Sequence, residues 1–207
     1  MANPHPQPTQ PYSDEQLLML YRQGNAWAFD QLIERYQLEL FHFLIRFAGS
    51  RQAAEDLFQE AFLQVHLSAD TFDTDKKFKP WLFTIAANKA RDYLRRNQRR
   101  QTMALSAPIG GDIGEEGQTF VDLLQADMEL PPEQLGRQET RQLVQAIVME
   151  MPEHLREILV LAYFHQFPYR EISEVLGIPL GTVKSRLHTA VATFAQQWKN
   201  RHGRDFE

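Results

Sequence analysis

Arginine residues gather in one short segment, RDYLRRNQRR at residues 91–100, where they fill five of ten positions. A helix through this segment places Thr84, Asn88, Arg91 and Arg95 on one face, because their spacing follows the helical repeat. Guanidinium groups bind phosphates, and an asparagine amide can hydrogen-bond the edge of a base. The segment therefore favours a nucleic-acid surface. The alternative is a solvated helix end whose cations face the negative pole of its own dipole.

A second candidate site lies near the C-terminus, in YREISEVLGIPLGTVKSRLHTAVATF at residues 169–194. Gly177 separates two short helical stretches, about 169–176 and 179–198, in the manner of a helix-turn-helix. Polar residues point outward near the start of the second helix, where they can enter a major groove: Thr182, Lys184, Ser185, Arg186, His188 and Thr189. The tight turn and the polar face favour DNA binding over a plain αα-hairpin.

Helical periodicity dominates the rest of the sequence, which must position these residues. Ser13 and Ser50 are good N-caps, and Gly49 is a good helix end. Phe29, Leu32, Ile33, Tyr36, Leu40, Leu44 and Phe47 form one apolar stripe. No segment alternates at period two. We therefore predict an all-α protein with two small helical domains, of which the C-terminal one carries the helix-turn-helix.

A segment rich in glycine and acidic residues separates the two domains. Residues 101–138 hold one basic and seven acidic residues, whereas residues 139–207 hold eight of each and residues 1–100 are nearly balanced. The net charge of −5 therefore comes from the linker. We expect a disordered tail at 1–12, an N-terminal domain at 13–100, a flexible linker at 101–138 with a short helix near 120–124, a C-terminal domain at 139–200 and a tail at 201–207.

Enzymatic and membrane functions find little support in the chain of 207 residues. GGDIGEEG at 110–117 resembles a cyclase motif only superficially, because it lies in a linker without strands. There is no cysteine, no phosphate-binding loop and no dinucleotide glycine pattern, and the seven histidines are scattered. No apolar run approaches the roughly 18 residues that a membrane helix needs. We expect a cytoplasmic protein that is not an enzyme and binds no cofactor or metal.

Three patches together resemble the extracytoplasmic-function (group 4) sigma factors of the sigma-70 family. They are AEDLFQEAFLQVH at 54–66, FKPWLFTIAANKARDYLRR at 78–96 and YREISEVLGIPLGTVKSRLHTA at 169–190. The resemblance implies a protein that binds core RNA polymerase, recognises −10 and −35 promoter elements, assists promoter melting and directs transcription initiation. It also implies an anti-sigma factor as a possible partner. The linker then resembles a nucleic-acid mimic inside the polymerase, and its alternative is a solvating spacer.

The resemblance also implies roles for single residues. Asp56, Gln59 and Glu60 match the face that docks on core polymerase; their alternative is an ordinary solvated helix face. The set implied for the −10 element is Phe72, Asn88, Arg91, Asp92, Arg95 and Arg96, with Phe72 expected as an exposed ring over a core of Phe78 and Trp81. Lys184, Ser185, His188 and Thr189 match positions facing the −35 element, with Thr182 and Arg186 on phosphates. The alternative function is a two-domain helix-turn-helix regulator whose N-terminal helices sense a ligand.

Overall fold

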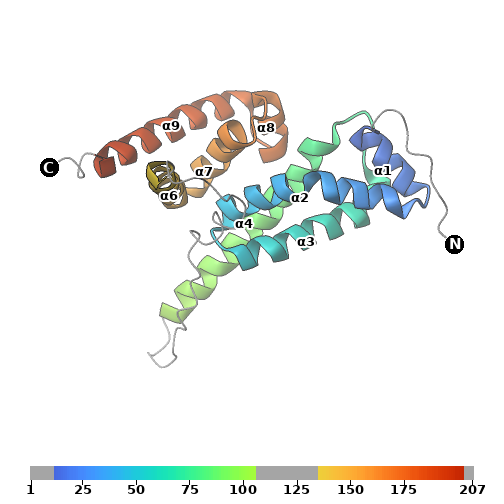
Figure 1. The fold of residues 1–207 in the computed structure, drawn as a ribbon, viewed down its shortest axis with the longest axis horizontal. Helices are drawn as coiled ribbons and strands as arrows, with labels where there is room; N and C mark the ends of the chain where they lie inside the picture. Colours follow the sequence, from blue (N-terminus) through green and yellow to red (C-terminus); the bar gives the residue numbers. More distant parts are fainter. Residues whose placement is uncertain (1–11, 106–134, 203–207) are drawn as a thin grey trace.

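A computed structural model describes residues 12–105 and 135–202, which form helices and turns without a strand. The N-terminal domain contains α1 (Asp14–Arg22), α2 (Ala26–Ala48), α3 (Arg51–Ser68), a 3₁₀ turn (Ala69–Thr71) and α4 (Phe78–Leu105). The C-terminal domain contains α6 (Leu135–Glu150), α7 (Glu153–Leu159), a π-helical turn (Val160–Phe164), α8 (Tyr169–Leu176) and α9 (Leu180–His202). Figure 1 shows α6–α9 lying along one flank of the α1–α4 bundle. The all-α prediction is confirmed.

The helix ends follow the expected capping chemistry. Ser13 and Gln16 form a reciprocal capping box at the start of α1. Gly49 ends α2 in the left-handed conformation with φ of 77°, and Ser50 then caps α3. Asn25 stands at the N-cap of α2, but its side chain makes no cap hydrogen bond. These signals set the boundaries between the first helices.

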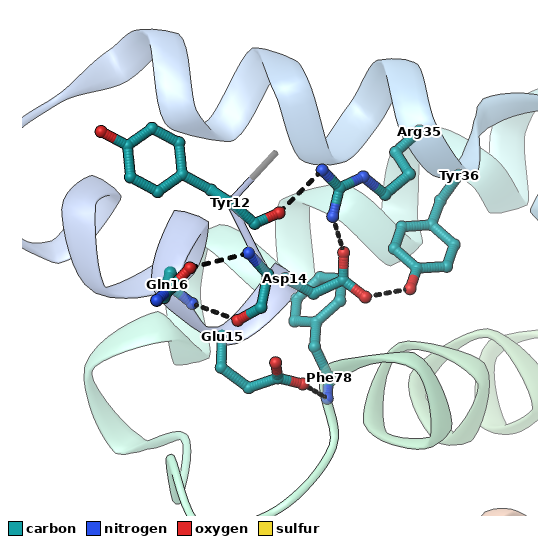
Figure 2. A network of polar contacts seen from close by, with 8 residues as sticks. Tyr12, Asp14, Glu15, Gln16, Arg35, Tyr36 and Phe78 are labelled. Carbon is teal, nitrogen blue, oxygen red and sulfur yellow. Dashed lines mark hydrogen bonds and ion pairs between the residues drawn. The ribbon is translucent and has the colours of Figure 1, made fainter. Parts of the chain in front are cut away.

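A polar network ties α1 to α2 and to the start of α4 (Figure 2). The carboxylate of Asp14 accepts from the Tyr36 hydroxyl and pairs with Arg35. Glu15 Oε1 accepts a 2.9 Å bond from the backbone N–H of Phe78, the first residue of α4. Glu15 thus caps a helix more than sixty residues away in the chain, and fixes where α4 begins.

The underside of α4 is made of small and aromatic core residues. Ala86, Ala87 and Ala90 are fully buried, as are Leu82 and Phe83. Alanines allow neighbouring helices to approach closely, and α4 packs against α2, α3 and α8. One helix therefore connects the cores of both domains while its polar side remains outside.

The C-terminal helices form the expected helix-turn-helix. Gly177 adopts φ of 64° between α8 and α9, a left-handed turn that suits glycine. Ile172 and Val175 of α8 pack with Val183 and Leu187 of α9, and all four are buried. The predicted turn and core of this motif are confirmed.

The two domains share one continuous core, which the sequence did not predict. His165 and Phe167, between the π-helical turn and α8, pack on aromatic rings of α2 and α4. Gln166 between them takes φ of 52° and stays exposed, so its two neighbours both face inward. Arg156 Nη1 of α7 donates a 2.8 Å bond to the Phe47 carbonyl at the end of α2. The expected linker helix near 120–124 lies outside the described residues.

We predict that Glu15→Ala destabilises the fold by about 1 to 2 kcal/mol at pH 7, because it removes the cap of α4. Burial opposes ionisation of Glu15, but bonds from the Phe78 N–H and its other donors outweigh it, and the pKa falls below the ordinary value of 4.5. The stabilisation is therefore complete above about pH 4.5 and disappears as the pH falls through the lowered pKa.

Urea unfolding at several pH values measures this effect. Asp30→Ala, on the exposed side of α2, is the matched control and should change the free energy of unfolding by less than about 0.5 kcal/mol. A Glu15 variant as stable as wild type at pH 7 would refute the capping role.

Candidate polymerase and promoter interfaces

The outward face of α4 carries the predicted basic residues. Asp92 organises two of them: its carboxylate pairs with Arg95, and its backbone carbonyl accepts a 3.3 Å bond from Arg96 Nε. A shallow depression beside them is lined by Glu60, Lys89, Asp92, Arg95, Arg96 and Arg99. Held this way, the guanidinium groups present a fixed set of donors that suits phosphate oxygens.

Two residues of the predicted −10 set contact each other, and one of them, Arg91, also contacts the other domain. Arg91 Nη1 donates to Asn88 Oδ1 at 3.1 Å, and Arg91 Nε lies 3.1 Å from Glu157 Oε2 of α7. Thr84, on the same face, donates to the carbonyl of Pro80 instead of pointing to solvent. The structure therefore splits this face: Arg95 and Arg96 face solvent, whereas Arg91 is turned toward the C-terminal domain.

The exposure expected of Phe72 is wrong. Its ring is only 6% exposed and packs on Trp81 with centroids 4.6 Å apart, with Phe78 behind it. Packing an aromatic ring against two neighbouring rings is more favourable than leaving it exposed to water. Phe78 is buried, as expected, while Trp81 is half-buried. The exposed side chains of this loop are polar, at positions 73–77.

The polar face of α3 lies beside the basic face of α4. Asp56 and Gln59 are exposed, and Glu60 Oε2 lies 3.6 Å from Lys89 Nζ of α4. Leu63 and Leu67 continue the same outer face and are 57% and 67% exposed. Neither leucine was predicted to belong to this surface, although their spacing from Glu60 indicates a shared helix face. Two neighbouring exposed leucines beside acidic residues are typical of a protein-binding surface.

The outward residues of the helix-turn-helix lie where the sequence predicts. Lys184, Ser185, His188 and Thr189 are exposed on α9, and Thr182 and Arg186 are half-buried. The hydroxyl groups are also ordered by the helix: Ser185 donates to the Thr182 carbonyl at 3.2 Å, and Thr189 to the Ser185 carbonyl at 3.1 Å. The arrangement leaves side chains from two turns of one helix free to enter a groove.

A partly buried polar cluster between the domains was not predicted. Glu39 of α2 lies 2.6 Å from Lys79 Nζ and 3.5 Å from His165 Nδ1. Burial lowers the pKa of His165 despite this carboxylate, so the imidazole is neutral at pH 7. In residues 12–105 and 135–202, no group of three metal-binding side chains is close enough to hold an ion.

Comparison with known proteins identifies the chain. The Sigma-70 region 2 model matches residues 32–100, and the Sigma-70, region 4 model matches residues 141–194. The ECF RNA polymerase sigma factor SigW of Bacillus subtilis (strain 168) is 31% identical over 179 residues, covering 86% of this chain and 93% of that relative. The chain belongs to the ECF sigma factors of the sigma-70 family.

Other comparisons agree with this membership. The ECF RNA polymerase sigma-E factor of Escherichia coli (strain K12) is 30% identical over 178 residues, covering 86% of this sigma factor and 90% of that one. The solved structure of CnrH in complex with the cytosolic domain of CnrY shares the fold, with a TM-score of 0.65 and 23% identity over 91% of this chain and 99% of CnrH. The structure of the sigma factor RpoE from Bartonella quintana, in complex with the anti-sigma factor NepR, has a TM-score of 0.62 and is 22% identical in sequence. It covers 83% of this chain and 96% of that one.

As an ECF sigma factor, the protein binds core RNA polymerase and promoter elements and directs transcription initiation; it is not an enzyme. The alternative of a ligand-sensing regulator is wrong, because the N-terminal helices match region 2. Along the described stretches, no helix of this sigma factor is long and apolar enough to cross a membrane.

We predict that Phe72→Ala lowers the free energy of unfolding by about 3 kcal/mol, because it empties the contact with Trp81. The matched control is Tyr163→Ala, since Tyr163 is an exposed ring and its loss should change stability by less than about 0.5 kcal/mol. Urea unfolding of the full chain measures both. Equally small losses of stability in the two variants would mean that the Phe72 ring is exposed.

Proposed function

We propose that this sigma factor binds polymerase and the two promoter elements through three separate surfaces. The outer face of α3 binds core polymerase, the outward face of α4 reads the −10 element, and the first two turns of α9 read the −35 element. We assign region 2 to residues 13–100 and region 4 to residues 139–200, joined by 101–138 and flanked by tails at 1–12 and 201–207. The exposed polar set on α9 is the observation that supports this division most, because Lys184, Ser185, His188 and Thr189 are all exposed on one helix.

The proposed polymerase surface consists of Asp56, Gln59 and Glu60, extended by Leu63 and Leu67. Acidic side chains attract and orient a basic partner, while exposed leucines add apolar area that association removes from water. The lateral contact of Glu60 with Lys89 places this surface next to the −10 residues. Polymerase docking and −10 recognition thus use adjoining sides of α3 and α4.

The proposed −10 surface consists of Asn88, Arg91, Asp92, Arg95 and Arg96. Asn88 and Asp92 offer hydrogen-bonding groups for base edges, and the arginines neutralise phosphates. Phe72 supports this surface from below, because it packs on Trp81 at the start of α4.

The proposed −35 surface consists of Lys184, Ser185, His188 and Thr189. Thr182 and Arg186 contact the phosphates of the DNA backbone. This fits the major groove, which admits one helix and offers a distinct pattern for each base pair. A further proposed partner is an anti-sigma factor, since the similar RpoE was solved with one. We also infer a cytoplasmic location, where polymerase and promoter DNA are found.

We predict that Asp56→Ala with Glu60→Ala weakens binding to core polymerase about tenfold or more, because both carboxylates leave the proposed docking face. Glu55→Ala is the matched control: it removes a carboxylate from the same helix, where Glu55 pairs with Arg51. Fluorescence anisotropy of labelled sigma factor titrated with core enzyme measures both. Equal affinities for the two variants would contradict the docking assignment.

We predict that Lys184→Ala with Arg186→Ala weakens promoter binding and flattens its salt dependence. Each lost phosphate contact should reduce the slope of log affinity against log salt by about 0.9. The measurement uses holoenzyme and a promoter fragment selected from genomic DNA. Lys199→Ala, at the exposed far end of α9, is the control. A slope equal to that of wild type would argue against phosphate contacts at these positions.

A further inference from the structure

Gly181 is the second residue of α9, immediately before the residues of the proposed −35 surface. Glycine is a poor residue for a helix, because it loses more backbone freedom on folding than any other residue and contributes no side chain to packing. Alanine at the same place would make the helix more stable. A glycine at this position therefore needs a reason other than helix formation.

Three other glycines show what such a reason looks like inside the protein. Gly24, Gly49 and Gly177 all have positive φ, and a Cβ atom on Gly49 would also lie 2.3 Å from Cε of Met149. Gly181 differs on both counts: its φ is not in the left-handed region, and a Cβ atom there would meet nothing within 4 Å. Neither the backbone of Gly181 nor its surroundings among the described residues require a glycine.

The position of Gly181 on α9 indicates where the reason lies. Lys184, Ser185 and His188 follow it at 3, 4 and 7 residues, which is the spacing of one helix face. All four residues are exposed. A side chain at position 181 would therefore be the first one on the face that we assign to the −35 element. The missing side chain leaves room on the DNA side of the helix.

The backbone next to this space carries hydrogen-bond donors. The Val183 N–H donates to the Pro179 carbonyl at 3.0 Å, which begins the hydrogen-bond ladder of α9. The amides of Leu180, Gly181 and Thr182 precede that ladder, and the side chain of Pro179 has no oxygen to cap them. Because Cα–Cβ bonds tilt toward the start of a helix, a methyl group at position 181 would project toward the same end as these donors.

We propose that Gly181 is a positioning residue for −35 recognition: its bare Cα lets one phosphate of the DNA backbone approach the start of α9. The proposal rests on the −35 surface proposed above. Contact between this phosphate and the exposed amides fixes how deeply Lys184, Ser185 and His188 enter the groove. A side chain at position 181 keeps the phosphate away, so the base contacts weaken although none of their residues has changed.

Gly181→Ala tests this inference because it should move folding and DNA binding in opposite directions. Urea unfolding of the free protein should show a folding equilibrium constant about two- to fivefold higher, as expected for alanine in place of glycine in a helix. Holoenzyme with this variant should bind a promoter fragment selected from genomic DNA about tenfold more weakly. The slope of log affinity against log salt should stay at the wild-type value, because no cation is lost. Unchanged affinity would overturn the proposal.

Ala195→Gly is the matched control, since Ala195 is an exposed residue of the same helix, about 20 Å farther along it. This change should lower the folding equilibrium constant and leave promoter affinity unchanged. An equal loss of affinity in both variants would trace the effect to the helix itself and overturn the proposal. If only Lys184→Ala with Arg186→Ala weakens binding, the −35 surface stands and the role of Gly181 is rejected. If no variant weakens binding, the −35 surface is rejected as well.

Methylphosphonate substitution of single phosphates in the −35 region provides the second readout. Each substitution replaces one charged phosphate oxygen by a methyl group, and holoenzyme affinity is measured for every position on both strands. We expect one position at which the substitution weakens binding by the wild-type protein several times but has little effect on Gly181→Ala, because that variant has already lost the contact. If the two proteins respond alike at every position, no phosphate depends on Gly181 and the proposal is overturned.

Discussion

The arrangement of this sigma factor depends on how α4 divides its surface. One side, built of Ala86, Ala87 and Ala90 with Phe83, is buried by helices from both domains. The other side carries arginines that must stay in water or meet phosphates, because a guanidinium group is costly to bury alone. The surrounding helices follow this division, because α2, α3 and α8 all pack against α4.

Charge is arranged so that each domain supplies what the other lacks. The N-terminal domain contributes Lys77, Lys79 and Arg91 to the seam, while the C-terminal domain contributes Glu157 and Glu171. Glu39 is an exception, because here the carboxylate belongs to the N-terminal domain. It lies beside Lys79 of the same domain and His165 of the other. Burial of Glu39 opposes its ionisation, but the bonds from His165 and Lys79 outweigh burial and lower its pKa. Glu39 is therefore ionised and paired with Lys79 at pH 7, while His165 beside it is neutral.

The sequence predicts local structure well because the signals for it are local. Ser13, Gly49 and Gly177 mark helix ends through their own backbone chemistry, and they lie where expected. The outward set on α9 follows from helical spacing alone. Phe72 was misjudged because periodicity says which residues share a face, but not which distant ring covers them. The Arg91–Glu157 pair joins positions 66 residues apart, and no pattern within either helix specifies its partner.

The bond from Arg156 to the Phe47 carbonyl has a consequence for motion. The last carbonyls of a helix have no partner within it, and here the other domain supplies one. Without this bond, the final turn of α2 would be held mainly by Gly49 and the following cap. The amides of that turn should then exchange their hydrogens with solvent faster. Hydrogen exchange at the end of α2 thus measures whether the C-terminal domain is packed against the N-terminal one.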